Sequence, residues 1–379
     1  MASIQTLLDP RLLSRLVSRK MVAEQWILGL MGMEVGGRNE VWLGHGRQGN
    51  FDVFNHTRTS GHGRAPGTAA GVIRRQKVGN VKFDYPRMHE MLPLKAEELH
   101  NLRAIGEDGA RDVAGRRYID LQTNYIAQRG ANWRAALVLG MLRDSLYMIP
   151  NGDDLYPSWT TGTDAIRVNF QVPAGNLDQL NMTGGGNIID VAWDNPSANI
   201  PNHLGNIDAA FQELYGGRLE NIVVTSSVWQ NVLRNDHVGS QAGIANTPFE
   251  SFQRQVGTRA DGSPINVTAA RLSCRPFVNW YVTDEGLELG APGSETFTKF
   301  IGDNNALFLP NPDQGNFFMQ LGSEPIADYD GAPETVRSGQ YLWSNKSYNP
   351  TTTNIFCLDN ALAINDIPNS VAYGTVKGF

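Results

Sequence analysis

The sequence has few cysteines and no long apolar run. Cys274 and Cys357 are the only cysteines among the 379 residues, which indicates two buried thiols in a reducing compartment rather than a disulfide framework. No stretch approaches the ~18 consecutive apolar residues that span a bilayer, which excludes an integral membrane protein with spanning helices. Apolar positions in residues 1–20 are periodic rather than continuous, so this segment does not have the order of a signal peptide.

Linear motifs of catalysis, metal binding and phosphate binding are also missing. The sequence contains no G-x-S-x-G, C-x-x-C, H-E-x-x-H or P-loop lysine motif. Three further groups fail the spacing tests for zinc, phosphate and calcium: they are the histidines His45, His56 and His62, the glycines 184–186, and the acidic residues between 328 and 334. We therefore expect no catalytic residue, no cofactor and no metal, and do not expect an enzyme.

What the sequence does contain is one long helical pattern over residues 110–143. Five large apolar residues recur at three-, four- and seven-residue spacings, which places them on one face of a helix: Ile119, Ile126, Trp133, Leu137 and Met141. Tyr118, Leu121 and Tyr125 continue a neighbouring stripe, and the flanks carry arginines 116, 129, 134 and 143. A helix of roughly 30 residues is about 45 Å long, which is longer than a compact domain requires and favours a subunit built for assembly.

Two segments precede this helix. Residues 9–17 have an aspartate cap, a proline and a leucine-rich face, so they predict a short amphipathic helix. That helix must pack on its own core, on an adjacent subunit or on a membrane surface. Residues 36–80 are polar and rich in glycine, with strand-like pieces at 40–43 and 51–54. A segment this long without core periodicity predicts a projecting, two-stranded arm.

The remainder reads as short strands and helices. Residues 148–152 predict a turn that ends the long helix, and 361–364 lead into a loop-like tail. Helices are predicted at 207–215, at 226–233 with Val228, Trp229, Val232 and Leu233 inward, and at 249–256. Strands are predicted at 165–172, 221–225, 266–268, 278–282, 306–309, 317–321 and 353–359.

Charge is distributed unevenly along the chain. The net charge of −6 combines a basic first part, residues 1–150, with an acidic remainder. Opposed charges could attract neighbouring copies to each other, or each part could simply be solvated. The basic part is dominated by arginine, which makes bidentate interface contacts. Its arginines are spread along a helix and an arm rather than clustered with stacking aromatics, so sequence-specific DNA reading is not expected.

The order of these segments resembles that of tailed-bacteriophage major capsid proteins, and within them the lambda-type major capsid protein E family. The residues that carry the resemblance are 9–17, the arm leading to 74–78, Arg116, Arg117, Gln122 and Arg134 in the long helix, and 221–233 and 304–310 in the later part. The resemblance covers the chain from end to end.

The resemblance implies an α+β fold of the Hong Kong 97 type. It implies an N-terminal arm at 1–35, an extended loop at 36–80, a peripheral domain at 81–204 with a spine helix at about 110–147, an axial domain at 205–345 and a C-terminal return to the peripheral domain at 346–379. The candidate contacts between subunits are Arg11, Arg15, Arg19, Trp42, Arg47, Phe51, Arg58, Arg64, Arg74, Arg75, Arg116 and Arg129.

The implied function is that of an icosahedral shell subunit in a virion. Its partners would be copies of itself in hexamers and pentamers, packaged double-stranded DNA bound without sequence preference, and scaffold, portal and decoration proteins, with the scaffold a separate chain. The chain departs from the family at one point. Some members cross-link covalently through a lysine in this loop, but residues 36–76 contain no lysine, so such a cross-link from this loop is in doubt. The alternatives are an encapsulin-type nanocompartment shell and a soluble α/β enzyme whose site is assembled from distant residues.

Overall fold

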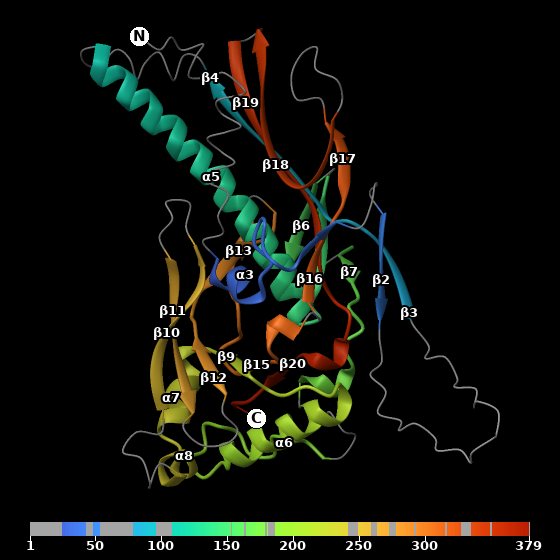
Figure 1. The fold of residues 1–379 in the computed structure, drawn as a ribbon, viewed down its shortest axis with the longest axis vertical. Helices are drawn as coiled ribbons and strands as arrows, with labels where there is room; N and C mark the ends of the chain where they lie inside the picture. Colours follow the sequence, from blue (N-terminus) through green and yellow to red (C-terminus); the bar gives the residue numbers. More distant parts are fainter. Residues whose placement is uncertain are drawn as a thin grey trace, which may run out of the picture.

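The computed structural model combines helices with five β-sheets (Figure 1), which confirms the predicted α+β class. It describes residues 25–42, 48–53, 79–95, 108–152, 154–162, 164–178, 180, 186–241, 249–258, 264–272, 278–291, 293–314, 317–326, 335–348 and 351–378. The predicted helix at 9–17 lies outside these residues.

The long helix α5, Asp108–Leu142, has 35 residues and is therefore about 52 Å long. In Figure 1 it runs from the centre of the molecule to the upper left, beyond the body. The five predicted core residues on its face are all buried. Every residue from 130 to 142 except Asn132 is buried. The amphipathic pattern therefore applies only to the preceding part of the helix.

The helix ends at Leu142, before the predicted residue 147, because the chain reverses there. Asp144 has a φ of 49°, and its carboxylate accepts a hydrogen bond of 3.2 Å from the amide of Phe170. Strand β5, Leu146–Asn151, follows and pairs with β6, Asp154–Ser158, and β7, Ile166–Val168. The turn predicted at 148–152 is therefore mostly strand, and the strand predicted at 165–172 is shorter.

A six-stranded sheet lies along α5. Its strands are β1 (Glu40–Trp42), β16 (Phe317–Leu321), β19 (Thr351–Asn365), β18 (Thr335–Tyr348), β17 (Ser323–Ile326) and β4 (Arg87–Lys95). β19 pairs with β18 and β4 over its first part and with β16 over residues 361–365. The strand predicted at 353–359 extends to residue 365, so residues 361–364 do not yet lead into a loop-like tail. Pairing with β16 buries alanines there that have little intrinsic preference for strands.

The predicted two-stranded arm corresponds to β2, Gln48–Val53, and β3, Gly79–Asp84, which pair in an antiparallel hairpin. Figure 1 shows this hairpin on the right-hand side of the molecule, separate from the larger sheets. The strand predicted at 40–43 is not part of the arm. It is β1, which pairs in parallel with β16 in the body.

A seven-stranded sheet forms the lower half of the molecule in Figure 1. Its order is β10 (Phe249–Thr258), β11 (Pro264–Leu272), β12 (Asn279–Val282), β9 (Asn221–Val224), β15 (Asn305–Leu309), β20 (Ala372–Thr375) and β8 (Leu177–Asp178). The helix predicted at 249–256 is wrong. Its apolar spacing suits a helix, but the segment is strand β10 because it pairs with β11 along nine positions.

Three helices pack beside this sheet: α6 (Ile200–Leu214), α7 (Ser226–Leu233) and α8 (Asp236–Gln241). α6 begins before the predicted residue 207, because the Asn199 side chain accepts a hydrogen bond of 3.2 Å from the Asn202 amide and caps the helix. In α7, Val228 and Val232 are buried as predicted. Leu233 is exposed, so its predicted inward position is wrong.

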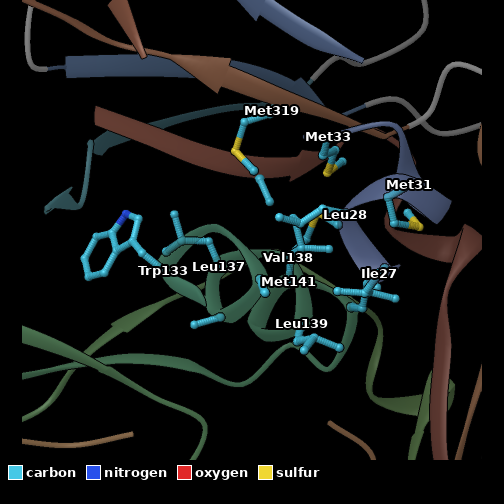
Figure 2. Packing of buried hydrophobic residues seen from close by; sticks show 14 of the residues in the cluster. Ile27, Leu28, Met31, Met33, Trp133, Leu137, Val138, Leu139, Met141 and Met319 are labelled. Atoms are coloured by element: carbon cyan, nitrogen blue, oxygen red, sulfur yellow. The ribbon is translucent and has the colours of Figure 1, made fainter. Parts of the chain in front are cut away.

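The smaller elements complete the chain. They are α3 (Trp26–Met31), the hairpin β13 (Gly286–Leu289) and β14 (Thr296–Lys299), and the short helices Ala174–Asn176, Pro312–Gln314 and Pro368–Ser370. Figure 2 shows how α3 packs on α5, with Ile27 and Leu28 beside Val138 and Leu139 and with Met319 of β16 close by. Each such side chain contributes roughly 1.5–3 kcal/mol on burial, so this junction fixes α3 against α5.

Candidate assembly surfaces

The exposed side of α5 carries four side chains spaced four residues apart: Arg117, Leu121, Tyr125 and Arg129. We call this set the α5 stripe. Leu121 is 58% exposed and Tyr125 is 55% exposed, although both are large apolar side chains. Residues 121–142 contain no aspartate or glutamate. The stripe is therefore apolar at its centre and basic at its ends, which is the composition of a protein contact rather than of an ordinary solvated helix face.

Arg129 holds one end of the stripe in place. Its Nε and Nη2 atoms donate to the two carboxylate oxygens of Glu90 on β4, both at 2.5 Å. The Arg129 Cζ atom also lies 5.8 Å from the centre of the Tyr125 ring. A bidentate pair fixes a guanidinium more firmly than a single contact does. Tyr125 is thus ordered in the isolated chain, which reduces the entropy lost when a partner covers it.

A second apolar surface lies on the sheet of β5, β6 and β7. Pro150 pairs with Leu155 in register, and Met148 pairs with Ile166, so these residues share one face of the sheet. Met148 is buried, whereas Pro150, Leu155 and Ile166 are exposed, Ile166 by 57%. The apolar face thus continues beyond the core into solvent, which makes it a second candidate contact.

The β2–β3 hairpin is a third surface. Its two strands pair only with each other among the strands that the structure describes, and the Asn80 side chain donates to the Asp52 carboxylate at 2.8 Å. A two-stranded hairpin is marginally stable in water unless another element supports it. Val53 packs into the core, and the Gln320 side chain of β16 donates to the Asn50 carbonyl at 3.3 Å, so part of the hairpin contacts the body. Its outer strand edges have no partner strand among the described residues, so a further chain can pair there.

A buried ion network connects α5, β19 and β1. Arg134 of α5 donates from Nε and Nη2 to Asp359 of β19, at 2.7 and 3.1 Å, and from Nη1 to Glu40 of β1, at 2.7 Å. The Arg134 and Asp359 side chains are fully buried. Burial lowers the pKa of Arg134, but Asp359 and Glu40 outweigh it and the net pKa shift is upward. The prediction that Arg134 lies on the helix flank is wrong.

A cavity of about 440 Å³ opens beside α6 and holds one histidine. The indole Nε1 of Trp193 donates to Nδ1 of His203 at 3.2 Å, so the imidazole proton resides on Nε2, which lies 2.8 Å from an Asp190 carboxylate oxygen. This hydrogen bond lowers the pKa of Asp190. Both ring nitrogens of His203 are occupied, so the geometry gives this imidazole a structural role.

No group of three or more His, Cys, Asp or Glu side chains gathers at metal-binding distance within the described part of the chain. No helix there is both long and apolar enough to cross a membrane. Cys357 on β19 is a buried free thiol, as predicted, and burial raises its pKa to about 12. Cys274 lies outside the described residues.

Most of the predicted contact residues also lie outside the described residues: Arg11, Arg15, Arg19, Arg47, Arg58, Arg64, Arg74 and Arg75. Trp42 lies in β1, where its backbone pairs with Leu321, and Phe51 lies in β2 opposite Val81. Arg116 lies in α5. Of the predicted set only Arg129 has a described side chain, and it is exposed.

Sequence reasoning did not select the residues at the centres of the two apolar surfaces. Leu121 and Tyr125 were visible as a stripe beside the buried face, and their four-residue spacing from Arg117 and Arg129 could have identified them. Leu155 and Ile166 gave no such signal. Their exposure follows from strand register, which the sequence alone does not specify.

The sequence matches no family model and no curated protein. Three solved structures of similar fold illustrate what the chain is similar to. A phage-related protein of Bordetella bronchiseptica RB50 is 10% identical, with 97% of each chain covered and a TM-score of 0.46. The mature capsid of bacteriophage PhiM1 is 12% identical, covering 90% of this chain and 86% of that one, with a TM-score of 0.43. The SrpI encapsulin of Synechococcus elongatus PCC 7942 is 8% identical, covering 90% and 86%, with a TM-score of 0.42. At these identities the likeness concerns the fold alone.

Proposed function

We propose that this protein is the structural subunit of an icosahedral viral capsid, of the Hong Kong 97 type and the lambda-type major capsid protein E family. It would assemble into hexamers and pentamers around double-stranded DNA and would reside in the virion. The observation that carries the proposal is that the single chain leaves several surfaces incomplete. A two-stranded hairpin stands apart from the larger sheets, and the α5 stripe exposes Leu121 and Tyr125.

These surfaces suit an assembly whose contacts differ from one side of the subunit to the other. Figure 1 shows α5 at the upper left and the β2–β3 hairpin at the right. A contact between two different surfaces is heterologous, and repeated heterologous contacts close into a ring when the rotation between neighbours closes. A capsomer is such a ring. The charge difference between the basic residues 1–150 and the acidic remainder supports the same arrangement, since opposite charges favour association and fix its register.

The domain mapping is part of the proposal. The N-terminal arm would be 1–35, the extended loop 36–80, the peripheral domain 81–204, the axial domain 205–345 and the C-terminal return 346–379. The arginines predicted on the arm and loop would contact neighbouring subunits. Packaged DNA would meet the inner face, with scaffold, portal and decoration proteins as further partners. Residues 36–76 contain no lysine, so contacts made by this part of the loop would be non-covalent.

Sedimentation velocity and negative-stain microscopy of the purified full chain test the proposal. We expect capsomers, shells or tubes at micromolar concentration. A monodisperse monomer that persists at high concentration and with co-expressed scaffold would contradict it. An encapsulin-type shell would show particles too, so their contents decide between the two functions. Nuclease-protected double-stranded DNA in particles from infected or induced cells indicates a capsid, whereas a co-purifying enzyme bound inside indicates a nanocompartment.

A further inference from the structure

Three charged side chains from distant parts of the chain meet between α5, β1 and β19. Glu40 comes from β1, Arg134 from α5 and Asp359 from β19. The side chains of Arg134 and Asp359 are completely buried, and that of Glu40 is 14% exposed. Glu40 is thus the outer member of the network, and the only one that water reaches.

Glu40 joins β1 to the helix through one carboxylate. One oxygen accepts from Nη1 of Arg134, and the other accepts from the backbone amide of Gly36 at 2.7 Å. Other attachments of β1 are few. The strand has three residues, it pairs in parallel with β16 at the edge of the sheet, and the Met319 amide donates to Asn39 at 2.7 Å. The ion pair is therefore a major part of what holds β1 against α5.

The charges in the network do not balance. Two carboxylates share one guanidinium, and Asp359 already occupies Nε and Nη2. The neighbouring groups add no second buried cation. Glu40 and Glu34 of the same segment repel each other, since Glu40 contributes to the raised pKa of Glu34, and Arg38 of that segment forms an exposed pair with Asp313. Cys357 and Glu90 lie on the Asp359 side. Excess negative charge in a buried site weakens the hold on its most accessible carboxylate.

We propose that Glu40 is a releasable latch. Its carboxylate on Arg134 holds β1 against α5, whereas the Arg134–Asp359 pair is a permanent part of the core. Release of Glu40 frees β1, the strand that precedes the β2–β3 hairpin in the chain, while α5 and β19 stay packed. The inference rests on the proposed function, in which the hairpin engages a second copy of the chain, and it names the contact that holds the strand preceding the hairpin.

Hydrogen exchange measured by mass spectrometry on the unassembled full chain tests the latch. In Glu40→Gln, which keeps the shape and removes the charge, we expect peptides containing β1 and Met319 to exchange at least tenfold faster. Peptides from α5 and from β18 and β19 should stay within twofold of the wild type. Asp359→Asn should instead accelerate exchange across α5 and β19 as well, because it removes a core partner.

The matched control is Arg38→Ala, which removes the exposed Arg38–Asp313 pair from the same segment and should leave β1 exchange unchanged. Unaltered β1 exchange in Glu40→Gln would overturn the latch, as would acceleration throughout the six-stranded sheet. Glu40→Asp keeps the charge but shortens the reach, and it should behave like Glu40→Gln. If neither Glu40 variant folds, Glu40 belongs to the core and the latch is again overturned. Since these measurements use unassembled chain, they are independent of whether shells form.

Discussion

Arg143 and Trp159 form a cation–π pair, with the guanidinium Cζ 5.0 Å from the centre of the indole ring system. The same Cζ lies 5.1 Å from the centre of the Tyr373 ring, and Nη1 donates to the carbonyl oxygens of Lys299 and Phe300. No carboxylate of the described residues pairs with it. The contact joins the end of α5 to β20 of the seven-stranded sheet, so it links the two halves of the molecule.

Substitution of Arg143 by lysine should destabilise the protein by roughly 2 kcal/mol. A guanidinium can lie flat against two rings and donate to two carbonyls, whereas an ammonium is a compact charge that needs closer hydration. Burial already lowers the pKa of Arg143, which shows that its charge is poorly compensated. Urea unfolding followed by far-ultraviolet circular dichroism measures the change.

Arg117→Lys, on the exposed side of the same helix, is the control and should shift stability by less than about 0.5 kcal/mol. Equal unfolding midpoints for Arg143→Lys and Arg117→Lys would show that the stacked geometry contributes nothing specific.

The α5 stripe should matter for assembly and not for folding. In Leu121→Ser combined with Tyr125→Ser, both changed side chains are more than half exposed, so the free energy of unfolding should change by no more than about 1 kcal/mol. Assembly should fall at least tenfold, because each apolar side chain that a partner buries contributes roughly 1.5–3 kcal/mol. Analytical ultracentrifugation of variant and wild type at matched concentrations measures the assembled fraction.

Asn124→Ser provides the matched control, since Asn124 is exposed on the same helix but lies outside the stripe. It should assemble as the wild type does. If the double variant yields normal shells, the stripe faces solvent in the particle and another surface, such as that around Ile166, makes the contact.

The sequence predicted α5 well because its signal is local. Five apolar residues at helical spacing predict a helix with one face against a core, and all five are buried. Arg134 lies among them in sequence, and the sequence pattern predicts it on the flank because arginine side chains are usually exposed. Its partner Asp359 is 225 positions away, and no local pattern links the two. The contact between Glu40 and Arg134 could not be predicted either, because these two residues are also far apart in the sequence.

The errors in the later part of the chain have a related cause. Residues 249–256 have apolar side chains at spacings compatible with a helix, but strand pairing with β11 decides the structure. Residues 361–364 contain alanines that suit a helix or a loop, but they complete the pairing of β19 with β16. In both segments a partner strand outside the sequence window overrides the local preference.

Two glycines in helices should respond in opposite directions to alanine. At Gly140 of α5 an added Cβ would lie 2.7 Å from the Cβ of Leu146, where the chain reverses tightly, so Gly140→Ala should destabilise by roughly 1–3 kcal/mol. At Gly205 of α6 an added Cβ would meet nothing within 4 Å, so Gly205→Ala should stabilise by about 0.5–1 kcal/mol through helix propensity. Thermal melting of the two variants beside the wild type measures both effects. A Gly140→Ala variant at least as stable as the wild type would contradict the close approach of β5 to α5, and a destabilised Gly205→Ala would contradict the open space at that position.

Asp366, just after β19, should make stability depend on pH. Burial raises the pKa of its carboxyl to about 6, above the value of about 3.9 in an unfolded chain. The folded state therefore binds a proton more tightly than the unfolded state does. The resulting stabilisation is complete below about pH 4 and is lost as the pH rises through 6.

Asp366→Asn mimics the protonated form, so it should be more stable than the wild type at pH 7.5 and equal to it at pH 4. The group is only partly buried, and solvent screening reduces the expected difference at pH 7.5 to about 1 kcal/mol. Comparing variant with wild type at each pH cancels the other carboxylates, which titrate in both proteins. Urea unfolding at pH 4, 5, 6 and 7.5 measures the difference. A difference that stays constant over this range would mean that the Asp366 carboxyl titrates alike in the folded and unfolded states.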